Sequence, residues 1–285
     1  MGNVKCAQEP LVVLDINLSK HITMATKRKI LLRREQKQYI PDLDREVKIA
    51  KEIFYYLSNL DQDAQTPLGS IKKKDLKKKP GSSVKSSQGK EFVLLDTNFI
   101  DDLKHIKRLP QTMPLKDIGL IVTTTGINKD SVIVDAGAGS GFLACYLAHL
   151  CKKVVTYDVN DKHLAISKEN AAFLGLKNIT IKKGSIYDKI PEKNADLVVL
   201  DVPEPEKAVN TAANALKIGG HVVAYTIHAT QLLNFVNAIL QDKRFLLVKS
   251  SELMERLWKA EKTMVRPKII PLGHSGFLTF ARKIC

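Results

Sequence analysis

Residues 132–141 constrain the fold of this chain more than any other segment. They read Val-Ile-Val-Asp-Ala-Gly-Ala-Gly-Ser-Gly, an apolar strand that runs directly into a glycine-rich turn. Gly137, Gly139 and Gly141 permit a tight turn and let a ligand approach the backbone closely. The apolar residues 142–148 are expected to begin a helix, whose first N–H groups face the same pocket.

An acidic residue in the following strand extends this pattern. Residues 153–158 are a second predicted strand that ends at Asp158, 21 residues after Gly137. A carboxylate about 20 residues beyond the first glycine commonly binds the ribose hydroxyls of a nucleotide cofactor. This series of strand, glycine turn, helix and second strand therefore predicts a binding site for a nucleotide or nucleoside cofactor. The simpler alternative is a purely structural turn.

The spacing of the glycines bears on which cofactor binds. The turn is Gly-x-Gly-x-Gly, whereas Gly-x-Gly-x-x-Gly binds a dinucleotide, and the chain contains no Gly-x-x-x-x-Gly-Lys-Ser/Thr phosphate loop. Asp135, just before the glycines, suits an amine or an ordered water better than a phosphate. A cofactor with a ribose diol, an amino-acid tail and no phosphate fits best, which indicates S-adenosylmethionine. The alternative is that Asp135 only caps the turn.

Composition excludes several classes of protein. The chain has 285 residues, of which 44% are hydrophobic and 26% charged, as expected for a globular protein with an α/β core and a small second domain. No apolar run approaches the roughly 18 residues of a membrane span, and the run at 11–14 is too short for a signal peptide. The four cysteines form no Cys-x-x-Cys pair, which predicts a cytoplasmic protein with reduced thiols and no metal site.

The chain carries a large positive charge. Its 45 Lys and Arg residues against 30 Asp and Glu give a formal net charge of +15. The basic residues are concentrated at 27–29, at 33–34 and above all at 72–79, which reads Lys-Lys-Lys-Asp-Leu-Lys-Lys-Lys. Such a charge attracts a polyanion, most commonly RNA or DNA. Two simpler explanations are a solvated loop and the high lysine content of proteins from hot environments.

Short apolar runs divide the chain into parts. Residues 1–23 are an extension of uncertain role, residues 24–97 predict a small β-rich domain, and residues 98–285 alternate strands with helices. In the last part, helices are expected at 162–174, 205–216 and 228–240, and strands at 132–135, 153–158, 179–181, 195–200, 221–225, 246–249 and 277–282. This series predicts an α/β, Rossmann-like fold with a mostly parallel sheet of seven strands and an antiparallel last strand.

The end of the fourth of these strands is a second candidate site. Ligands of an open α/β sheet bind at the carboxyl ends of its strands. The strand runs into Asp-Val-Pro-Glu-Pro at 201–205, where two prolines restrict the backbone. Asp201 is therefore predicted to lie at the mouth of the cofactor site as the catalytic residue. The alternative is that Asp201 caps the helix that follows.

Further motifs run through residues 65–283. They lie at 79–87, 107–119, 135–143, 201–205, 256–258, 265–267 and 273–278, the last reading Gly-His-Ser-Gly-Phe-Leu, and they close with Ala-Arg-Lys at 281–283. Together they resemble the tRNA (adenine-N1)-methyltransferases of the bacterial and archaeal type. The last stretch is specific to this family rather than to the fold.

The resemblance implies a class I methyltransferase fold, S-adenosylmethionine as cofactor, tRNA as substrate and a homotetramer. The reaction implied is N1-methylation of adenine 58 in the T loop, with adenine 57 as a further target in archaeal members. The cofactor residues implied are Gly137, Ala138, Gly139, Ser140, Gly141, Phe142, Leu143, Asp158, His163, Ser185 and Ile186. The substrate residues implied are Lys107, Arg108, Gln111, Lys116 and Asp117, with Gln111 and Asp117 in a loop that closes over the methyl-transfer site.

Three positions depart from the family pattern. Ser185 stands where an acid is usual, Pro114-Leu115 where an aromatic residue and a proline precede Lys-Asp, and Glu206 where a tryptophan is common. These departures bear on the substrate more than on the reaction type. Two other functions stay open: a non-catalytic, RNA-binding subunit of such an enzyme, and a class I methyltransferase for a small molecule. The glycine turn and Asp201 argue against the first, and the basic runs argue against the second.

Overall fold

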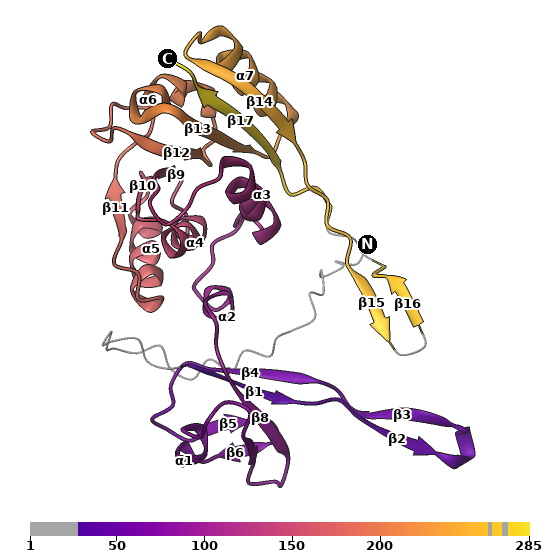
Figure 1. Ribbon diagram of the computed structural model, residues 1–285. Helices are drawn as coiled ribbons and strands as arrows, with labels where there is room; N and C mark the ends of the chain where they lie inside the picture. The colour runs from indigo at the N-terminus through magenta and orange to yellow at the C-terminus, as the bar shows by residue number, and fades with distance from the viewer. Residues whose placement is uncertain (1–27, 262–263, 270–272) are drawn as a thin grey trace. The chain divides into compact units, whose positions relative to one another are not determined.

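The computed structural model describes residues 28–261, 264–269 and 273–285. The predicted extension at 1–23 lies outside these residues. The described chain divides into two units, of which the first ends at Lys104 and the second begins at His105 (Figure 1). Each unit has its own β-sheet, and each is described by itself.

The first unit is built on a four-stranded antiparallel sheet. The order is β4-β1-β8-β7, with β1 (Lys29–Arg33), β4 (Ile53–Leu57), β7 (Ser83–Lys85) and β8 (Glu91–Asp96). Leu31 on β1 lies opposite Tyr55 and Leu94 on the neighbouring strands, and all three side chains are buried. The apolar runs of this segment therefore form one face of a core, which confirms the β-rich N-terminal part that the sequence predicted.

Smaller elements complete this unit. They are the hairpins β2 (Gln36–Ile40) with β3 (Arg45–Ala50) and β5 (Ala64–Thr66) with β6 (Gly69–Ile71), and the short helices η1 (Pro41–Leu43), α1 (Lys73–Leu76) and α2 (Phe99–Lys104). Ile71 and Leu76 belong to the buried core, so they attach β6 and α1 to the main sheet. The β2–β3 hairpin is almost entirely exposed and was not predicted.

The second unit contains a seven-stranded sheet in the order β11-β10-β9-β12-β13-β17-β14. Its strands are β9 (Val132–Ala136), β10 (Lys153–Asp158), β11 (Ile179–Lys183), β12 (Ala195–Leu200), β13 (Leu216–Thr226), β14 (Phe245–Ser251) and β17 (Phe277–Lys283). Strands β9 to β13 are parallel neighbours, and β17 lies antiparallel between β13 and β14. The predicted mostly parallel sheet with an antiparallel last strand is confirmed.

Helices cover this sheet (Figure 1). They are α3 (Leu115–Thr125), α4 (Phe142–Leu150), α5 (Asp161–Phe173), η2 (Pro205–Ala208), α6 (Val209–Ala215) and α7 (Ala229–Gln241). Helices α4 and α5 contact β10 and β11, α6 contacts β12 and β13, and α7 contacts β13, β14 and β17. Residues 197–200 of β12 are fully buried, as a parallel strand covered on both faces requires.

Two predicted elements differ in their bounds from the structure, and one hairpin was not predicted. The helix expected at 205–216 divides into η2, which begins at Pro205, and α6. The strand expected at 221–225 begins earlier, at Leu216, and passes through Gly220, where a Cβ would lie 2.9 Å from a backbone oxygen of β12. The hairpin β15 (Trp258–Glu261) with β16 (Met264–Pro267) was not predicted, because its exposed strands carry no pattern of alternating burial.

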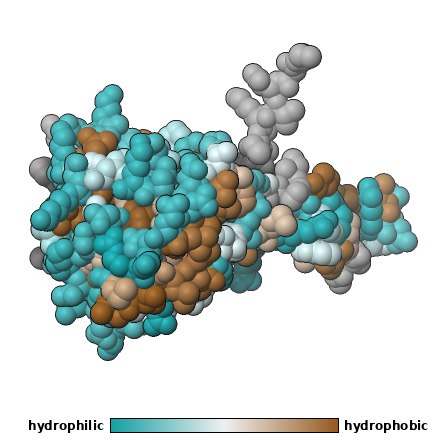
Figure 2. All heavy atoms as spheres, turned by 90° about the horizontal axis from the view of Figure 1, so that it is seen from above, coloured by the Kyte–Doolittle hydropathy of each residue, from teal (hydrophilic) through white to brown (hydrophobic). Residues whose placement is uncertain are grey.

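The surface of the second unit carries exposed apolar side chains. Figure 2 shows apolar areas among mainly hydrophilic side chains on the face seen from above. Exposed large apolar residues include Leu240 on α7, Leu246 on β14, and Trp258 and Val265 on the β15–β16 hairpin. In the part of the chain that the structure describes, no helix combines the length and apolar character that a membrane crossing requires. Exposed apolar areas of this kind are candidates for contact with another protein chain.

Candidate active site

The glycine turn lies against the carboxyl ends of β9 and β12. Gly137, Gly139 and Gly141 have φ angles of 90°, 51° and 76°, a region that favours glycine. A Cβ on Gly137 would lie 1.9 Å from the backbone oxygen of Asp201, so no larger residue fits there. The N–H of Asp201 donates to the carbonyl oxygen of Ala136 at 2.8 Å. The glycine turn and the predicted catalytic residue therefore touch through their backbones.

Helix α5 supports the turn with a polar face. His163, Ser167 and Asn170 are spaced four and three residues apart, so they lie on one side of the helix. The hydroxyl of Ser167 donates to the carbonyl oxygen of Gly139 at 3.0 Å, and the Asn170 amide donates to that of Ser140 at 2.7 Å. Sequence reasoning missed Ser167 and Asn170. The sequence carries no local signal for them, because only the folded chain shows which side of α5 packs against the turn.

Asp158 ends β10 beside the same turn. Its Oδ2 accepts a hydrogen bond from the N–H of Gly139 at 3.0 Å and lies 3.1 Å from Nδ1 of His163. Its Oδ1 accepts from the N–H of Asn160 at 2.8 Å. These contacts hold the carboxylate at the carboxyl edge of the sheet, where a ribose-binding acid is expected. His163 thus adjoins the predicted cofactor residues.

Asp135 is a buried acid with an unused oxygen. Its side chain is 1% exposed, and Oδ2 accepts a hydrogen bond from the Thr156 hydroxyl at 2.5 Å, while Oδ1 is buried with no partner in the described structure. Burial raises the pKa of Asp135 to about 7. Burial, together with the negative charge of Asp135, also raises the pKa of Asp201 to about 7. Two acids in this state favour a ligand that brings a cation or a hydrogen-bond donor.

Other predicted cofactor residues lie at the ends of the neighbouring elements. Phe142 and Leu143 begin α4 directly after the turn, and both are buried. Ile186 follows β11 and belongs to the core of this unit. The hydroxyl of Ser185 accepts a hydrogen bond from the N–H of Tyr187 at 3.1 Å, so it is engaged in a local turn.

S-adenosylmethionine fits these residues. It carries two cationic groups, a ribose diol and no phosphate. The unpartnered oxygen of Asp135 and the acid at Asp201 suit a cation, and Asp158 suits a diol. The turn is open at Gly139, where a Cβ would meet no atom closer than 3.9 Å. The residues at this site therefore fit S-adenosylmethionine as the cofactor.

The predicted substrate residues Lys107 and Arg108 lie close to the glycine turn. The N–H and carbonyl oxygen of Lys107 are both bound by the Asn170 side chain, at 3.0 and 2.8 Å. The Lys107 ammonium is paired with Glu169 at 2.5 Å. The Arg108 guanidinium lies 4.9 Å from the centre of the Phe142 ring. The segment is therefore attached to α4 and α5, both of which adjoin the turn.

Lys116 and Asp117 form a buried ion pair in the first turn of α3. The prediction that Asp117 lies in a loop is wrong, because Asp117 belongs to α3. Gln111, at φ 65°, lies in the turn that precedes the helix. The side chains of Lys116 and Asp117 are 7% and 1% exposed, and their charged atoms are 2.7 Å apart. Buried charges are stable only with such partners, because leaving water is costly.

The ion pair also joins distant parts of the unit. Lys116 Nζ donates to the carbonyl oxygen of Leu253 and to the hydroxyl of Ser275, both at 2.6 Å, and that hydroxyl donates to Asp117 at 2.9 Å. Tyr225, at the end of β13, donates to the Ser275 carbonyl oxygen at 2.5 Å. Leu253 and Ser275 flank the β15–β16 hairpin in the sequence. The network therefore fixes both ends of that segment. Ser275 lies in the family motif at 273–278, but neither Ser275 nor Tyr225 was predicted as a site residue.

The loop after β12 is held in place by two side chains. The amide of Gln231 on α7 donates to the carbonyl oxygen of Pro203 at 2.8 Å. The N–H of Glu204 donates to the hydroxyl of Tyr187 at 3.2 Å. Together with the prolines, these bonds limit the positions that Asp201 can adopt.

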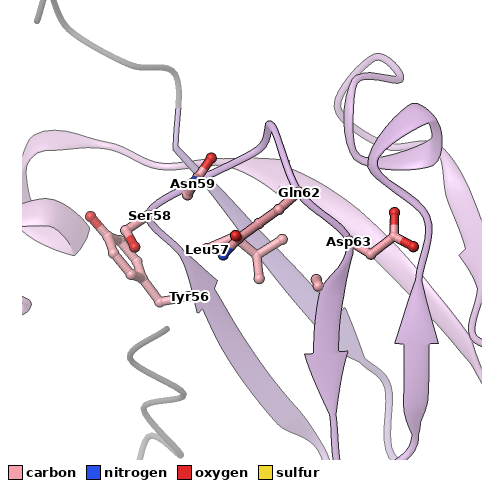
Figure 3. Close-up of a pocket in the computed structure, with 7 residues that line it drawn as sticks. Tyr56, Leu57, Ser58, Asn59, Gln62 and Asp63 are labelled. Atoms are coloured by element: carbon pink, nitrogen blue, oxygen red, sulfur yellow. The ribbon is translucent and has the colours of Figure 1, made fainter. Parts of the chain in front are cut away.

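A separate small hollow lies in the first unit (Figure 3). Its volume is about 20 Å³, which is room for about one water. It contains none of the predicted site residues and is lined by Tyr56, Leu57, Ser58, Asn59, Gln62, Asp63 and Ala64. Within residues 28–261, 264–269 and 273–285, no three His, Cys, Asp or Glu side chains are grouped to hold a metal ion.

Comparison with known sequences identifies relatives over most of the chain. Residues 127–266 match a family model described as a methyltransferase domain. A tRNA (adenine(57)-N(1)/adenine(58)-N(1))-methyltransferase TrmI from Methanocaldococcus jannaschii is 31% identical over 258 residues, which are 80% of this chain and 90% of that protein. A tRNA (adenine(58)-N(1))-methyltransferase TrmI from Thermus thermophilus is 31% identical over 209 residues, 72% of this chain and 82% of that protein.

Solved structures share the fold. An S-adenosylmethionine-dependent O-methyltransferase from Thermotoga maritima has a TM-score of 0.74 and 26% identity, with 90% of this chain and 93% of that chain covered. The tRNA (m1A58) methyltransferase TrmI from Aquifex aeolicus has a TM-score of 0.70 and covers 90% of this chain and 97% of that chain. Its sequence identity of 18% supports the fold alone.

Proposed function

The chain belongs to the TrmI family of tRNA (adenine-N1)-methyltransferases, and from this premise we propose that it transfers a methyl group from S-adenosylmethionine to N1 of an adenine in tRNA. The observation that carries the proposal is the position of Asp201. This acid directly follows β12 and is in backbone contact with the glycine turn, to which we assign the cofactor. The names of the relatives support adenine 58 as the target, with adenine 57 as a second one.

The chemistry of adenine suits an acid in this position. Bound S-adenosylmethionine supplies an electrophilic methyl group. The N1 atom of neutral adenine has a free lone pair, so no strong base is needed. Positive charge develops on the purine during transfer, and an ionised Asp201 that accepts a hydrogen bond from the exocyclic amine stabilises it. One such electrostatic contact contributes about 3–4 kcal/mol to the transition state.

The ionisation of Asp201 depends on its surroundings. Burial and the charge of Asp135 raise its pKa to about 7, which disfavours the carboxylate that the reaction needs. A cation bound nearby has the opposite effect, because it stabilises the ionised form. Asp201 is therefore best prepared for transfer when the cationic cofactor is present.

The cofactor residues have separate roles in this proposal. The glycine turn and the buried Asp135 hold the amino-acid tail, and Asp158 holds the ribose diol. Phe142, Leu143 and Ile186 supply apolar contacts around the cofactor, while His163 positions Asp158. Lys107, Arg108 and Gln111 lie on the segment that approaches the turn and contact the substrate.

Association of several copies of the chain is part of the proposal. Exposed apolar residues on the β15–β16 hairpin, Trp258, Met264 and Val265, support a protein contact, since a hairpin of two strands is barely stable alone. We infer a homotetramer that acts on tRNA in the cytoplasm. The molar mass in solution, measured by light scattering, tests the tetramer, and a monomer at micromolar concentration would contradict it.

Transfer of labelled methyl groups to an unmodified tRNA transcript tests the substrate. Transcripts in which adenine 57, adenine 58 or both are replaced serve as matched acceptors. The proposal predicts that replacement of adenine 58 removes most of the transfer. Full transfer to the transcript that lacks both adenines would contradict the assignment.

A further inference from the structure

Positive charge in the first unit is concentrated in one segment. Residues 72–90, called here the lysine segment, contain eight lysines and one acid, Asp75. The rest of the described unit, 28–71 and 91–104, contains nine basic and eleven acidic residues. The net positive charge of this unit therefore comes entirely from the lysine segment.

The segment is arranged so that its charges face water. All eight of its lysines are exposed: Lys72, Lys73, Lys74, Lys77, Lys78, Lys79, Lys85 and Lys90. Leu76, in the middle of the longest run, is fully buried in the core of the unit. One apolar anchor thus fixes the run to the fold while the lysines on both sides point outward.

The backbone beneath these lysines is held by specific hydrogen bonds. The N–H of Lys73 donates to Asp63 at 2.8 Å, and the buried ammonium of Lys29 donates to the carbonyl oxygen of Lys78 at 2.6 Å. The N–H of Gly81 donates to the carbonyl oxygen of Leu94 on β8 at 2.7 Å. The Lys29 ammonium also lies 3.3 Å from the Asp96 carboxylate on β8, so Lys29 ties this turn to the main sheet.

Only part of the charge is neutralised within the protein. Lys72, Lys77 and Lys78 are paired with Asp63, Asp61 and Asp75, at 3.0, 2.9 and 2.8 Å. Lys73, Lys74 and Lys79 form no ion pair in the described part of the chain. These three lysines are therefore available to an external anion.

We propose that the lysine segment binds the phosphate backbone of tRNA, with Lys73, Lys74 and Lys79 as its principal contacts. This inference rests on the proposed function. None of the large exposed apolar residues lies in the segment, so it offers charge without a group that inserts into a membrane or an apolar protein surface. Contacts of this kind give affinity without reading sequence, and they weaken as salt increases.

A triple variant of the full chain, Lys73→Ala with Lys74→Ala and Lys79→Ala, tests the proposal. Each phosphate contact contributes about 0.7–0.9 to the slope of log affinity against log salt. Loss of three contacts is expected to lower that slope by about 2–3. The affinity gained between 200 and 50 mM salt then becomes about 30-fold smaller. The dissociation constant for S-adenosylmethionine and kcat at saturating tRNA are expected to stay within about twofold of the wild type.

The chain offers a matched control. Lys129, Lys152 and Lys177 are exposed lysines that precede β9, β10 and β11, at the edge of the sheet away from the strand ends of the active site. Their triple alanine variant removes the same charge. Its salt slope is expected to change by less than about one, because no phosphate contact is proposed for these lysines. Arginine at positions 73, 74 and 79 is expected to restore the wild-type slope.

The outcomes separate this inference from the proposed function. If the wild type does not methylate tRNA, the proposed function fails. If the wild type methylates tRNA and the lysine-segment variant keeps its KM and salt slope, the inference is overturned. Equal losses in the test and control variants would also overturn it, because they would show a general effect of net charge. The inference is also overturned if arginine at positions 73, 74 and 79 fails to restore the wild-type salt slope.

Discussion

Replacement of Gly137 by alanine tests the contact on which the active site depends. The new Cβ would lie 1.9 Å from the backbone oxygen of Asp201, so the two loops must separate by more than about 1 Å to reach an ordinary contact. Gly139→Ala is the matched control. Both glycines have positive φ, but a Cβ on Gly139 meets no atom within 3.9 Å.

The expected loss of stability in each variant follows from the space around the new Cβ. Both variants bear the cost of an alanine in the left-handed region, about 1–2 kcal/mol. Only Gly137→Ala adds the cost of forcing an atom into filled space, typically about 1–3 kcal/mol. We therefore expect Gly137→Ala to lower the free energy of unfolding by about 2 kcal/mol more than Gly139→Ala. The same shift moves Asp201, and a displacement of about 1 Å is expected to lower the methyl-transfer rate about 100-fold.

Urea unfolding of both variants without cofactor measures the difference in their free energies of unfolding. Absence of cofactor matters, because a Cβ on Gly139 can also obstruct ligand binding. Single-turnover experiments measure the loss of methyl-transfer rate. Equal stability of the two variants, or a Gly137→Ala enzyme with the wild-type rate, would refute the reasoning.

Two further predictions follow from the buried charges. Asp135 and Asp201 have raised pKa values, both about 7, so they lose protons when a cationic cofactor binds. Because the ionised acids bind the cation better, affinity for S-adenosylmethionine is expected to rise from pH 6 to pH 8. Calorimetry in buffers of different ionisation enthalpy measures the released protons, and an affinity independent of pH would contradict the prediction. Lys116→Met leaves the charge of Asp117 buried without its partner and is expected to cost about 3–5 kcal/mol in urea unfolding. Lys107→Met, which breaks an exposed pair, is expected to cost less than about 1 kcal/mol, and equal costs would argue against the buried network.

The sequence was sufficient to predict the sheet and the parts of the site that are local in the chain. The strand, glycine turn and helix at 132–148 form a signal that periodicity and glycine spacing reveal directly. The position of Asp201 near this turn was also predictable, because the carboxyl ends of parallel strands meet at one edge of the sheet. Its backbone contact with Gly137 could not be predicted, since that contact depends on atomic distances across two strands.

Contacts between distant segments left no comparable signal. Lys116 and Ser275 are 159 positions apart, and no local pattern shows that they meet. Ser167 and Asn170 look like ordinary polar residues of a surface helix, because only the folded chain shows that this side of α5 faces the glycine turn. The β15–β16 hairpin was missed for a different reason: neither strand packs into the core, so burial imposes no alternation on its residues.

The central claim is that Asp201 stabilises the charge that develops as N1 of an adenine in tRNA is methylated. Single-turnover transfer to an unmodified tRNA transcript, with wild type and Asp201→Asn and with mass analysis of the product nucleosides, tests it most directly. The account predicts 1-methyladenosine as the product and a rate about 100- to 1,000-fold lower for Asp201→Asn, with tRNA affinity little changed and a much smaller loss of cofactor affinity than of rate. A product other than 1-methyladenosine, or an Asp201→Asn enzyme with the wild-type rate, would contradict it.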